Sequence, residues 1–256
     1  MDTSIAVAMT LAVLVGVALG LLGGGGSILT VPIFTFVLGI GTKEAIASSL
    51  FVVAVTGAVS AATRLRQGEV RWKVAGVFAA AGVIGGVAGG LIGQLLPAPV
   101  LTALFAAIMI VTAITMMRPR RQRTEHLGRT PTMLGTRMMA TGLGVGVLTG
   151  ALGAGGGFLL VPAFTFLGLP IAAAVGTSLL VIAANSSAGF VTQIASVAIN
   201  WPTVLAFTAL AINGSFIGMV ISRRLSAAAL RTAFGVLVLA VGVTMLATVI
   251  IPTISA

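Results

Sequence analysis

The hydrophobic residues of this chain follow one another in long runs that do not alternate with polar residues. Runs of spanning length include 74–93, 101–117, 204–221 and 234–251. A membrane-spanning helix needs about 20 apolar residues to cross about 30 Å of hydrocarbon. Because backbone polar groups in lipid must be paired within their own segment, these runs are predicted to be helices. The pattern therefore predicts an all-α, polytopic membrane protein.

Each half of the chain is predicted to contain about five hydrophobic segments. They cover residues 5–22, 28–39, 45–63, 73–93 and 99–117 in the first half, and 135–152, 158–169, 172–193, 202–222 and 227–251 in the second. The second segment of each half is unusual, since about 12 residues of helix reach only about 18 Å. Pro32 and Pro162 lie inside these short segments. They are predicted to be buried in protein or to line a cavity, and full spans and re-entrant hairpins both remain open.

A sequence repeat relates the two halves. Residues 31–36 read VPIFTF and residues 161–166 read VPAFTF, and each copy follows a glycine-rich cluster, at 23–27 and 153–157. The chain is therefore predicted to be a duplicated unit. Its predicted parts are a first transmembrane repeat (1–117), a basic linker (118–136) and a second transmembrane repeat (137–256).

Charge predicts the orientation of the repeats. Only 7% of the residues are charged, and all but one of the 14 Lys and Arg fall at 64–73, 118–137 and 223–231, beside hydrophobic segments. If each half crosses the membrane an odd number of times, the repeats are inverted and all three clusters share one side. The positive-inside rule favours this topology, with the linker in the cytoplasm and both termini outside the inner membrane. The net charge of +10 therefore indicates no nucleic-acid partner.

The ionisable residues form no constellation for catalysis. The four carboxylates (Asp2, Glu44, Glu69 and Glu125) are predicted near segment ends or in loops, the single histidine, His126, falls in the linker, and there is no cysteine. Hydrolysis or metal-assisted chemistry needs clustered Asp, Glu, His or Cys. The glycine strings also lack the strand that precedes a dinucleotide-binding loop. We predict no enzyme activity, no cofactor and no metal site.

The glycine clusters are the first candidate binding elements. Glycines elsewhere in the chain are interpreted as sites of close helix packing, Gly214 and Gly218 among them. Consecutive glycines destabilise a helix by about 1 kcal/mol each, so these clusters are predicted to break it. A break exposes the amides and the positive dipole end of the next helix, which together attract an anion. The predicted substrate-binding residues at the two breaks are Gly25, Gly26, Ser27, Gly155, Gly156 and Gly157.

Polar side chains supply the remaining candidates. Ser48, Ser49, Thr177 and Ser178 lie in matching positions near the start of the third segment of each half. They either cap a helix or donate hydrogen bonds to an oxyanion, and both interpretations remain open. Asn185 and Asn213 are weaker candidates, because interhelical hydrogen bonding is the usual role of such residues. The two breaks are predicted to face each other around one cavity that the four hydroxyls also line.

The chain resembles the sulfite exporter family of the TauE/SafE type. The resemblance rests on the glycine-rich string followed by Val-Pro-x-Phe at 23–34 and 153–164, and on the Ser/Thr-Ser-Leu string at 47–50 and 176–179. It extends over essentially the whole chain. It implies a bacterial or archaeal inner-membrane permease for a small sulfur-containing anion, such as sulfite, sulfoacetate or a related sulfonate. One departure is Ala47-Ser48 where the second copy has Gly176-Thr177.

These features predict an exporter of a small anionic substrate that works within the lipid bilayer. The alternatives are an anion channel and an uptake permease for another small anion. Proton relays in transporters use intramembrane Asp, Glu or His, and the centres of the predicted spans contain none. Efflux is therefore predicted to follow the membrane potential, which supplies about 2.3 kcal/mol per charge per 100 mV. Glu44 is the alternative relay.

Overall fold

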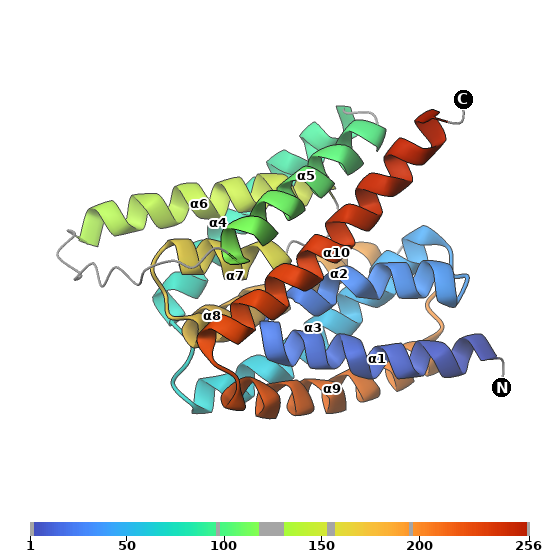
Figure 1. The fold of residues 1–256 in the computed structure, drawn as a ribbon, viewed down its shortest axis with the longest axis horizontal. Helices are drawn as coiled ribbons and strands as arrows, with labels where there is room; N and C mark the ends of the chain where they lie inside the picture. Colours follow the sequence, from blue (N-terminus) through green and yellow to red (C-terminus); the bar gives the residue numbers. More distant parts are fainter. Residues whose placement is uncertain (1–2, 96–97, 118–130, 153–156, 195–196, 255–256) are drawn as a thin grey trace.

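The computed structural model describes residues 3–95, 98–117, 131–152, 157–194 and 197–254. Within these ranges the regular structure is helical throughout, and no strand occurs (Figure 1). The elements are α1 (Thr3–Leu22), α2 (Gly25–Pro32), a π-helix (Ile33–Val37), α3 (Thr42–Arg66), α4 (Trp72–Leu95), α5 (Ala98–Met117), α6 (Pro131–Leu152), α7 (Gly157–Phe166), α8 (Ile171–Gln193), α9 (Trp201–Arg224) and α10 (Ala227–Ile254). The predicted all-α fold class is confirmed.

Four of the described helices are long and apolar enough to cross a membrane. These segments are Ile5–Leu22, Lys43–Arg66, Ile171–Val191 and Trp201–Arg224. By contrast, α2 has 8 residues and α7 has 10. Helices of that length reach only about 12–15 Å, so neither crosses a bilayer by itself.

Proline explains the irregular backbone after α2. Pro32 is the last residue of α2, and the chain continues as the π-helix Ile33–Val37. Proline supplies no backbone N–H and its ring crowds the preceding turn, so regular α-helical bonding is interrupted there. A second proline also changes a predicted boundary. Helix α6 begins at Pro131, a residue favoured in the first turn of a helix, so residues 131–136 of the predicted linker are helical.

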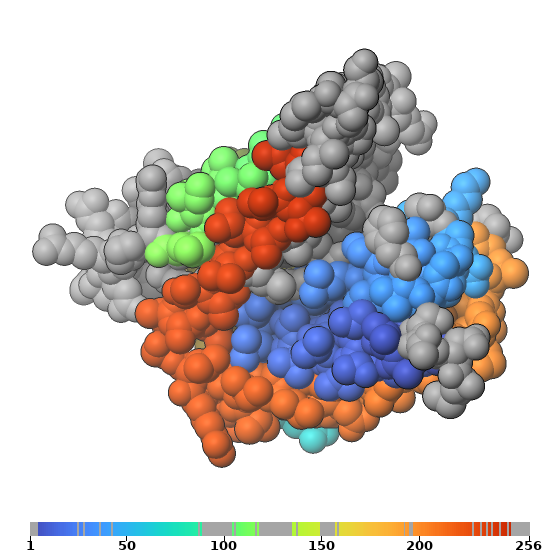
Figure 2. Space-filling model, turned by 45° about the vertical axis from the view of Figure 1, so that its right-hand side comes forward, coloured from blue at the N-terminus to red at the C-terminus, as the bar shows by residue number. Residues whose placement is uncertain are grey.

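Helices pair across the two halves of the chain. The extensive contacts are α4 with α6, α1 with α9, α5 with α10 and α3 with α8, and the short helices α2 and α7 also touch. Figure 1 shows α1 lying along α9, and Figure 2 shows α10 lying alongside α5. The core consequently lies between the halves, with Phe34 of the first half packed in a tilted arrangement against Phe207 of the second at a ring-centroid distance of 4.9 Å.

The directions of the paired helices follow from the residues in contact. In the α3–α8 pair, Leu50 lies beside Gly189, whereas Gly57 lies beside Leu179 and Ala183, so the two helices are antiparallel. In the α5–α10 pair, Met117 lies beside Gly235 and Met109 beside Gly242, so these are antiparallel as well. Equivalent helices of inverted repeats must be antiparallel. The pairing supports inversion, and the axis that relates the repeats stays a prediction.

Glycines bring the backbones of α1 and α9 into direct contact. A Cβ on Gly16 or Gly20 would overlap the α9 backbone at Ala211 or Ser215. A Cβ on Gly214 or Gly218 would likewise overlap the α1 backbone. Small residues allow such close approach of membrane helices, and van der Waals contact then holds the pair together. The packing role predicted for Gly214 and Gly218 agrees with this arrangement.

We expect Gly214→Leu to destabilise the folded protein, because its added side chain must displace the α1 backbone. Overpacking of this kind costs about 1–3 kcal/mol or more. The matched control is Gly76→Leu in α4, where no atom lies within 4 Å of the added Cβ. Thermal melting of the two purified variants in detergent, followed by size-exclusion chromatography, measures the difference. Equal melting temperatures for the two variants would contradict close packing of α1 on α9.

Candidate substrate site

The first glycine cluster separates α1 from α2. The Gly23 N–H donates to the Leu19 carbonyl at 2.8 Å, and Gly23 takes a φ of 73°. Helix α2 then begins at Gly25, and no side chain caps its N-terminus. The Ser27 hydroxyl instead donates to the Gly24 carbonyl at 2.7 Å. This is the helix break that the sequence predicts, with the positive end of α2 free of any acidic side chain in its first turn.

The break in the first half lies against the start of α7 in the second half. A Cβ placed on Gly157 would be 3.0 Å from the Ser27 hydroxyl oxygen and 2.8 Å from Cδ1 of Ile182. Helix α2 also contacts α7 directly. Gly155 and Gly156 lie outside the described residues. The described residues thus bring the first turn of α2 beside the start of α7, and the meeting of two helix breaks stays a prediction.

Gly26 has a packing role. A Cβ at this position would come within 2.8 Å of Cγ of Leu19 and closer still to the Val15 carbonyl oxygen. The glycine therefore lets the first turn of α2 fold back onto α1. The packing role is additional to the predicted role of the Gly26 backbone in substrate binding, which stays a prediction.

The Ser178 hydroxyl of α8 contacts the first break, and the Thr177 hydroxyl contacts the segment between α3 and α4. Thr177 and Ser178 are fully buried. The Ser178 hydroxyl lies 2.9 Å from the Gly23 carbonyl oxygen and 2.8 Å from that of Val175. The Thr177 hydroxyl accepts from the Arg71 N–H at 3.1 Å. Residues of the second half thus fix the backbone conformation of the break in the first half.

The equivalent hydroxyls of α3 lie elsewhere. Ser48 is buried without a hydrogen-bond partner, and the Ser49 hydroxyl donates to the Ile46 carbonyl at 2.9 Å. Because α3 and α8 are antiparallel, Thr177 lies beside the α3 turn near residue 61 rather than beside Ser48. About a dozen helical residues, roughly 20 Å, separate the two positions. The prediction that all four hydroxyls line one cavity is wrong, since antiparallel pairing places equivalent residues at opposite ends.

The two asparagine candidates also lie apart. Asn185 in α8 has a buried amide oxygen without a partner, and a Cβ placed on Gly82 of α4 would lie 3.5 Å from its Nδ2. Asn213 is exposed on α9, and its Nδ2 donates to the Ala209 carbonyl of its own helix at 2.8 Å. The structure therefore does not bring Asn213 to the helix breaks.

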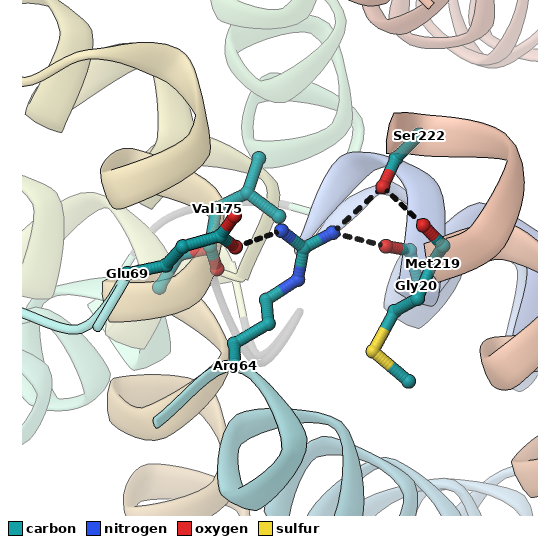
Figure 3. Close-up of polar contacts among 7 residues, drawn as sticks. Gly20, Arg64, Glu69, Val175, Met219 and Ser222 are labelled. Atoms are coloured by element: carbon teal, nitrogen blue, oxygen red, sulfur yellow. Dashed lines mark hydrogen bonds and ion pairs between the residues drawn. The ribbon is translucent and has the colours of Figure 1, made fainter. Parts of the chain in front are cut away.

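Arg64 is a buried polar residue that the sequence pattern did not predict. The pattern places this arginine in a basic cluster beyond the segment 45–63, but α3 continues to Arg66 and Arg64 is only 4% exposed. Figure 3 shows its guanidinium between Glu69 on one side and Gly20 and Ser222 on the other. Nη1 donates to Oε2 of Glu69 at 2.6 Å, and Nη2 donates to the Gly20 carbonyl at 2.7 Å and to Oγ of Ser222 at 3.2 Å.

Arg64 links three elements that meet beside the first break. Gly20 belongs to the last turn of α1, and Ser222 belongs to α9 in the second half. A charge removed from water is costly unless it is paired, and Glu69 supplies the pairing here. A clue in the sequence was available, because Thr56, Ser60 and Arg64 recur at intervals of four and so share one helix face.

Two apolar halves that pair with each other, with buried polar groups beside the break between α1 and α2, are typical of a polytopic membrane transport protein. Among the described residues, no group of three or more His, Cys, Asp or Glu is placed to hold a metal ion. The chain belongs to the sulfite exporter TauE/SafE family, whose sequence pattern it matches over residues 8–245.

Relatives with similar sequences carry transporter names. The chain is 36% identical over 243 residues to a probable membrane transporter protein of Xylella fastidiosa, covering 90% of each chain. It is 26% identical to the probable membrane transporter protein YdhB of Bacillus subtilis, covering 70% of this chain and 76% of the relative. A probable membrane transporter protein of Methanocaldococcus jannaschii is 28% identical, covering 73% of this chain and 72% of the relative. This chain is accordingly a multi-pass membrane transporter.

Proposed function

We propose that this transporter exports a small sulfur-containing anion, of which sulfite and sulfoacetate are the first candidates, across the inner membrane. The observation that carries the proposal is the close approach of Ser27, in the first turn of α2, to Gly157, the first residue of α7. The uncapped N-terminus of α2 supplies backbone amides and a positive dipole there, which favour an anion. Such a site holds its ligand without covalent chemistry, as release on the far side requires.

The proposed orientation places the basic linker in the cytoplasm and both termini outside. Basic side chains are exposed in both halves of the chain. They are Arg66, Arg71 and Lys73 before the linker, and Arg223 and Arg224 after it. The antiparallel pairing of α3 with α8 supports two inverted repeats. With inverted repeats all three basic clusters lie on the same side of the membrane, and the positive-inside rule assigns that side to the cytoplasm. The repeats would have the ranges 1–117 and 137–256, with their short helices at equivalent depth.

We further propose that the membrane potential drives the export. Glu44 is the alternative relay, and its carboxylate accepts a hydrogen bond from the Asn200 N–H at 3.3 Å near the protein surface. Glu69 is paired with Arg64. Both carboxylates therefore have structural partners, which supports efflux of the anion without a coupled proton.

Efflux from proteoliposomes tests the function directly. Vesicles loaded with labelled sulfite or sulfoacetate should lose the label faster with the protein than without it. An inside-negative potassium diffusion potential should accelerate the loss of label, because it drives the negatively charged substrate out of the vesicle. A flux that follows a pH gradient at zero potential, and that Glu44→Gln abolishes, would contradict the proposed coupling.

Counterflow separates a carrier from a channel. Unlabelled sulfite outside the vesicle should accelerate efflux through a carrier, whereas an open pore would show no such acceleration. The protein could instead transport neither sulfite nor sulfoacetate out of the vesicles and take up a different small anion. That result would identify it as an uptake permease and contradict the proposed export.

A further inference from the structure

Two hydroxyls one turn apart on α3 differ from most hydroxyls of the described helices. Serine and threonine side chains in a helix commonly donate to a carbonyl three or four residues earlier. Thr63 does so to Val59 at 3.0 Å, and Thr208 to Val204 at 2.6 Å. In contrast, Thr56 and Ser60 are fully buried, and neither hydroxyl has a hydrogen-bond partner.

A third unpartnered polar atom lies on the same helix face. Nε of Arg64 is buried without a partner, although both terminal nitrogens of the guanidinium are bonded. Residues four apart on a helix are neighbours on its surface, so Thr56, Ser60 and Arg64 form a continuous row. This polar row leads along α3 to the point where Arg64 touches Gly20, three residues before the break at Gly23.

Buried polar groups are almost always hydrogen-bonded in folded proteins, because leaving one unpaired forfeits its bonds to water. One orphaned group can reflect local strain. Three in a row, two hydroxyls and one guanidinium N–H, indicate a ligand that supplies the missing acceptors. Nε–H of Arg64 can only donate and the two hydroxyls can donate as well as accept, so the oxygen atoms of an oxyanion are acceptors that suit all three groups.

The bonds of Arg64 fix the direction of its free donor. Glu69 holds one terminal nitrogen, and Gly20 and Ser222 hold the other (Figure 3). Because the guanidinium is planar, anchoring both ends leaves Nε–H in a fixed position without further loss of freedom. A preorganised donor of this kind binds more tightly than a mobile one.

We propose that Arg64, Ser60 and Thr56 bind the transported oxyanion in succession, first between Nε–H of Arg64 and the Ser60 hydroxyl and then between the two hydroxyls, because Thr56 and Arg64 are eight helical residues, about 12 Å, apart. This inference rests on the proposed function and names the residues that contact the substrate beside the first break. Glu69 then regulates affinity, because its carboxylate already neutralises the guanidinium and competes with the incoming anion. Its side chain is 25% exposed and so can turn towards water when the anion binds.

Substitutions along the polar row test the proposal through the KM for sulfite efflux, measured from vesicles loaded at graded sulfite concentrations. Thr56→Val and Ser60→Ala should each raise the KM roughly 10-fold, as expected for a lost hydrogen bond to a charged ligand. Their melting temperatures without ligand should not fall, because each change removes an unsatisfied buried group. If a hydroxyl only stabilised the fold, its removal would instead lower the melting temperature and leave the KM unchanged. The matched control, Thr63→Val, removes a hydroxyl that is bonded within α3 and should leave the KM unchanged.

Charge substitutions give the second part of the test. Arg64→Gln should raise the KM roughly 100-fold, whereas Arg66→Gln, an exposed arginine of the same helix end, should not change it. Glu69→Gln should lower the KM, because it removes the carboxylate that competes for Arg64. If Arg64→Gln cannot be recovered folded, the two hydroxyl variants and Glu69→Gln decide the question.

The possible failures are distinguishable. Wild-type flux with an unchanged KM in Thr56→Val, Ser60→Ala and Glu69→Gln would overturn this site and leave the proposed function standing. Absence of both sulfite and sulfoacetate flux from the wild-type protein would overturn the proposed function itself. Stabilisation of purified wild-type protein by sulfite, and its loss in Ser60→Ala, would support the site independently of flux.

Discussion

Gly157→Leu is expected to reduce sulfite efflux to the level of protein-free vesicles while the protein still inserts and folds. The new side chain would start 3.0 Å from the Ser27 hydroxyl oxygen and 2.8 Å from Cδ1 of Ile182. Both neighbours are side-chain atoms, which can shift, so the added bulk is accommodated by filling the space between α2 and the start of α7. Flux and melting temperature, measured on the same preparation, separate a blocked site from an unfolded protein.

The matched control is Gly144→Leu in α6, where no atom lies within 4 Å of the added Cβ. This exposed substitution adds the same side chain and should leave the flux near the wild-type value. Gly26→Leu is less informative, because its Cβ would meet the α1 backbone and destabilise the fold. Wild-type flux through Gly157→Leu would contradict a substrate path between α2 and α7.

The helices were predictable because their physical cause is local. Continuous apolar runs determine which segments are helical, and the first glycine cluster determines where α1 ends and α2 begins. The predicted segment 5–22 corresponds closely to α1 (Thr3–Leu22), and the predicted segment 172–193 corresponds closely to α8 (Ile171–Gln193). Shortness of the second segment in each half also appears in the structure, as α2 and α7.

The arrangement of the site was less predictable because it depends on pairing between distant segments. Inverted repeats imply antiparallel equivalent helices, but the sequence did not reveal that α3 packs directly along α8, and so Ser48 and Thr177 were expected at one cavity. Arg64 was missed for a related reason. A basic residue at a segment end normally reaches water, and only contacts with Gly20, Glu69 and Ser222 retain this one in the interior.

Gly23→Ala is expected to reduce both stability and transport, for two separable reasons. Gly23 has a φ of 73°, a conformation that costs an L-residue about 1–2 kcal/mol. Its added methyl group would also lie 2.8 Å from the Ser178 hydroxyl oxygen and 2.8 Å from Cγ1 of Val175. Overpacking adds about 1–3 kcal/mol, so the total loss should be about 2–5 kcal/mol.

Gly68→Ala isolates the conformational part of this loss. Gly68 has a similar φ of 72°, but nothing lies within 4 Å of its added Cβ. The control should therefore lose only about 1–2 kcal/mol and retain transport. Thermal melting compares the stabilities, and vesicle efflux compares the functions. If Gly23→Ala were no less stable than Gly68→Ala, the contact between the first break and α8 would not hold the break in place, and the two halves would not be joined there.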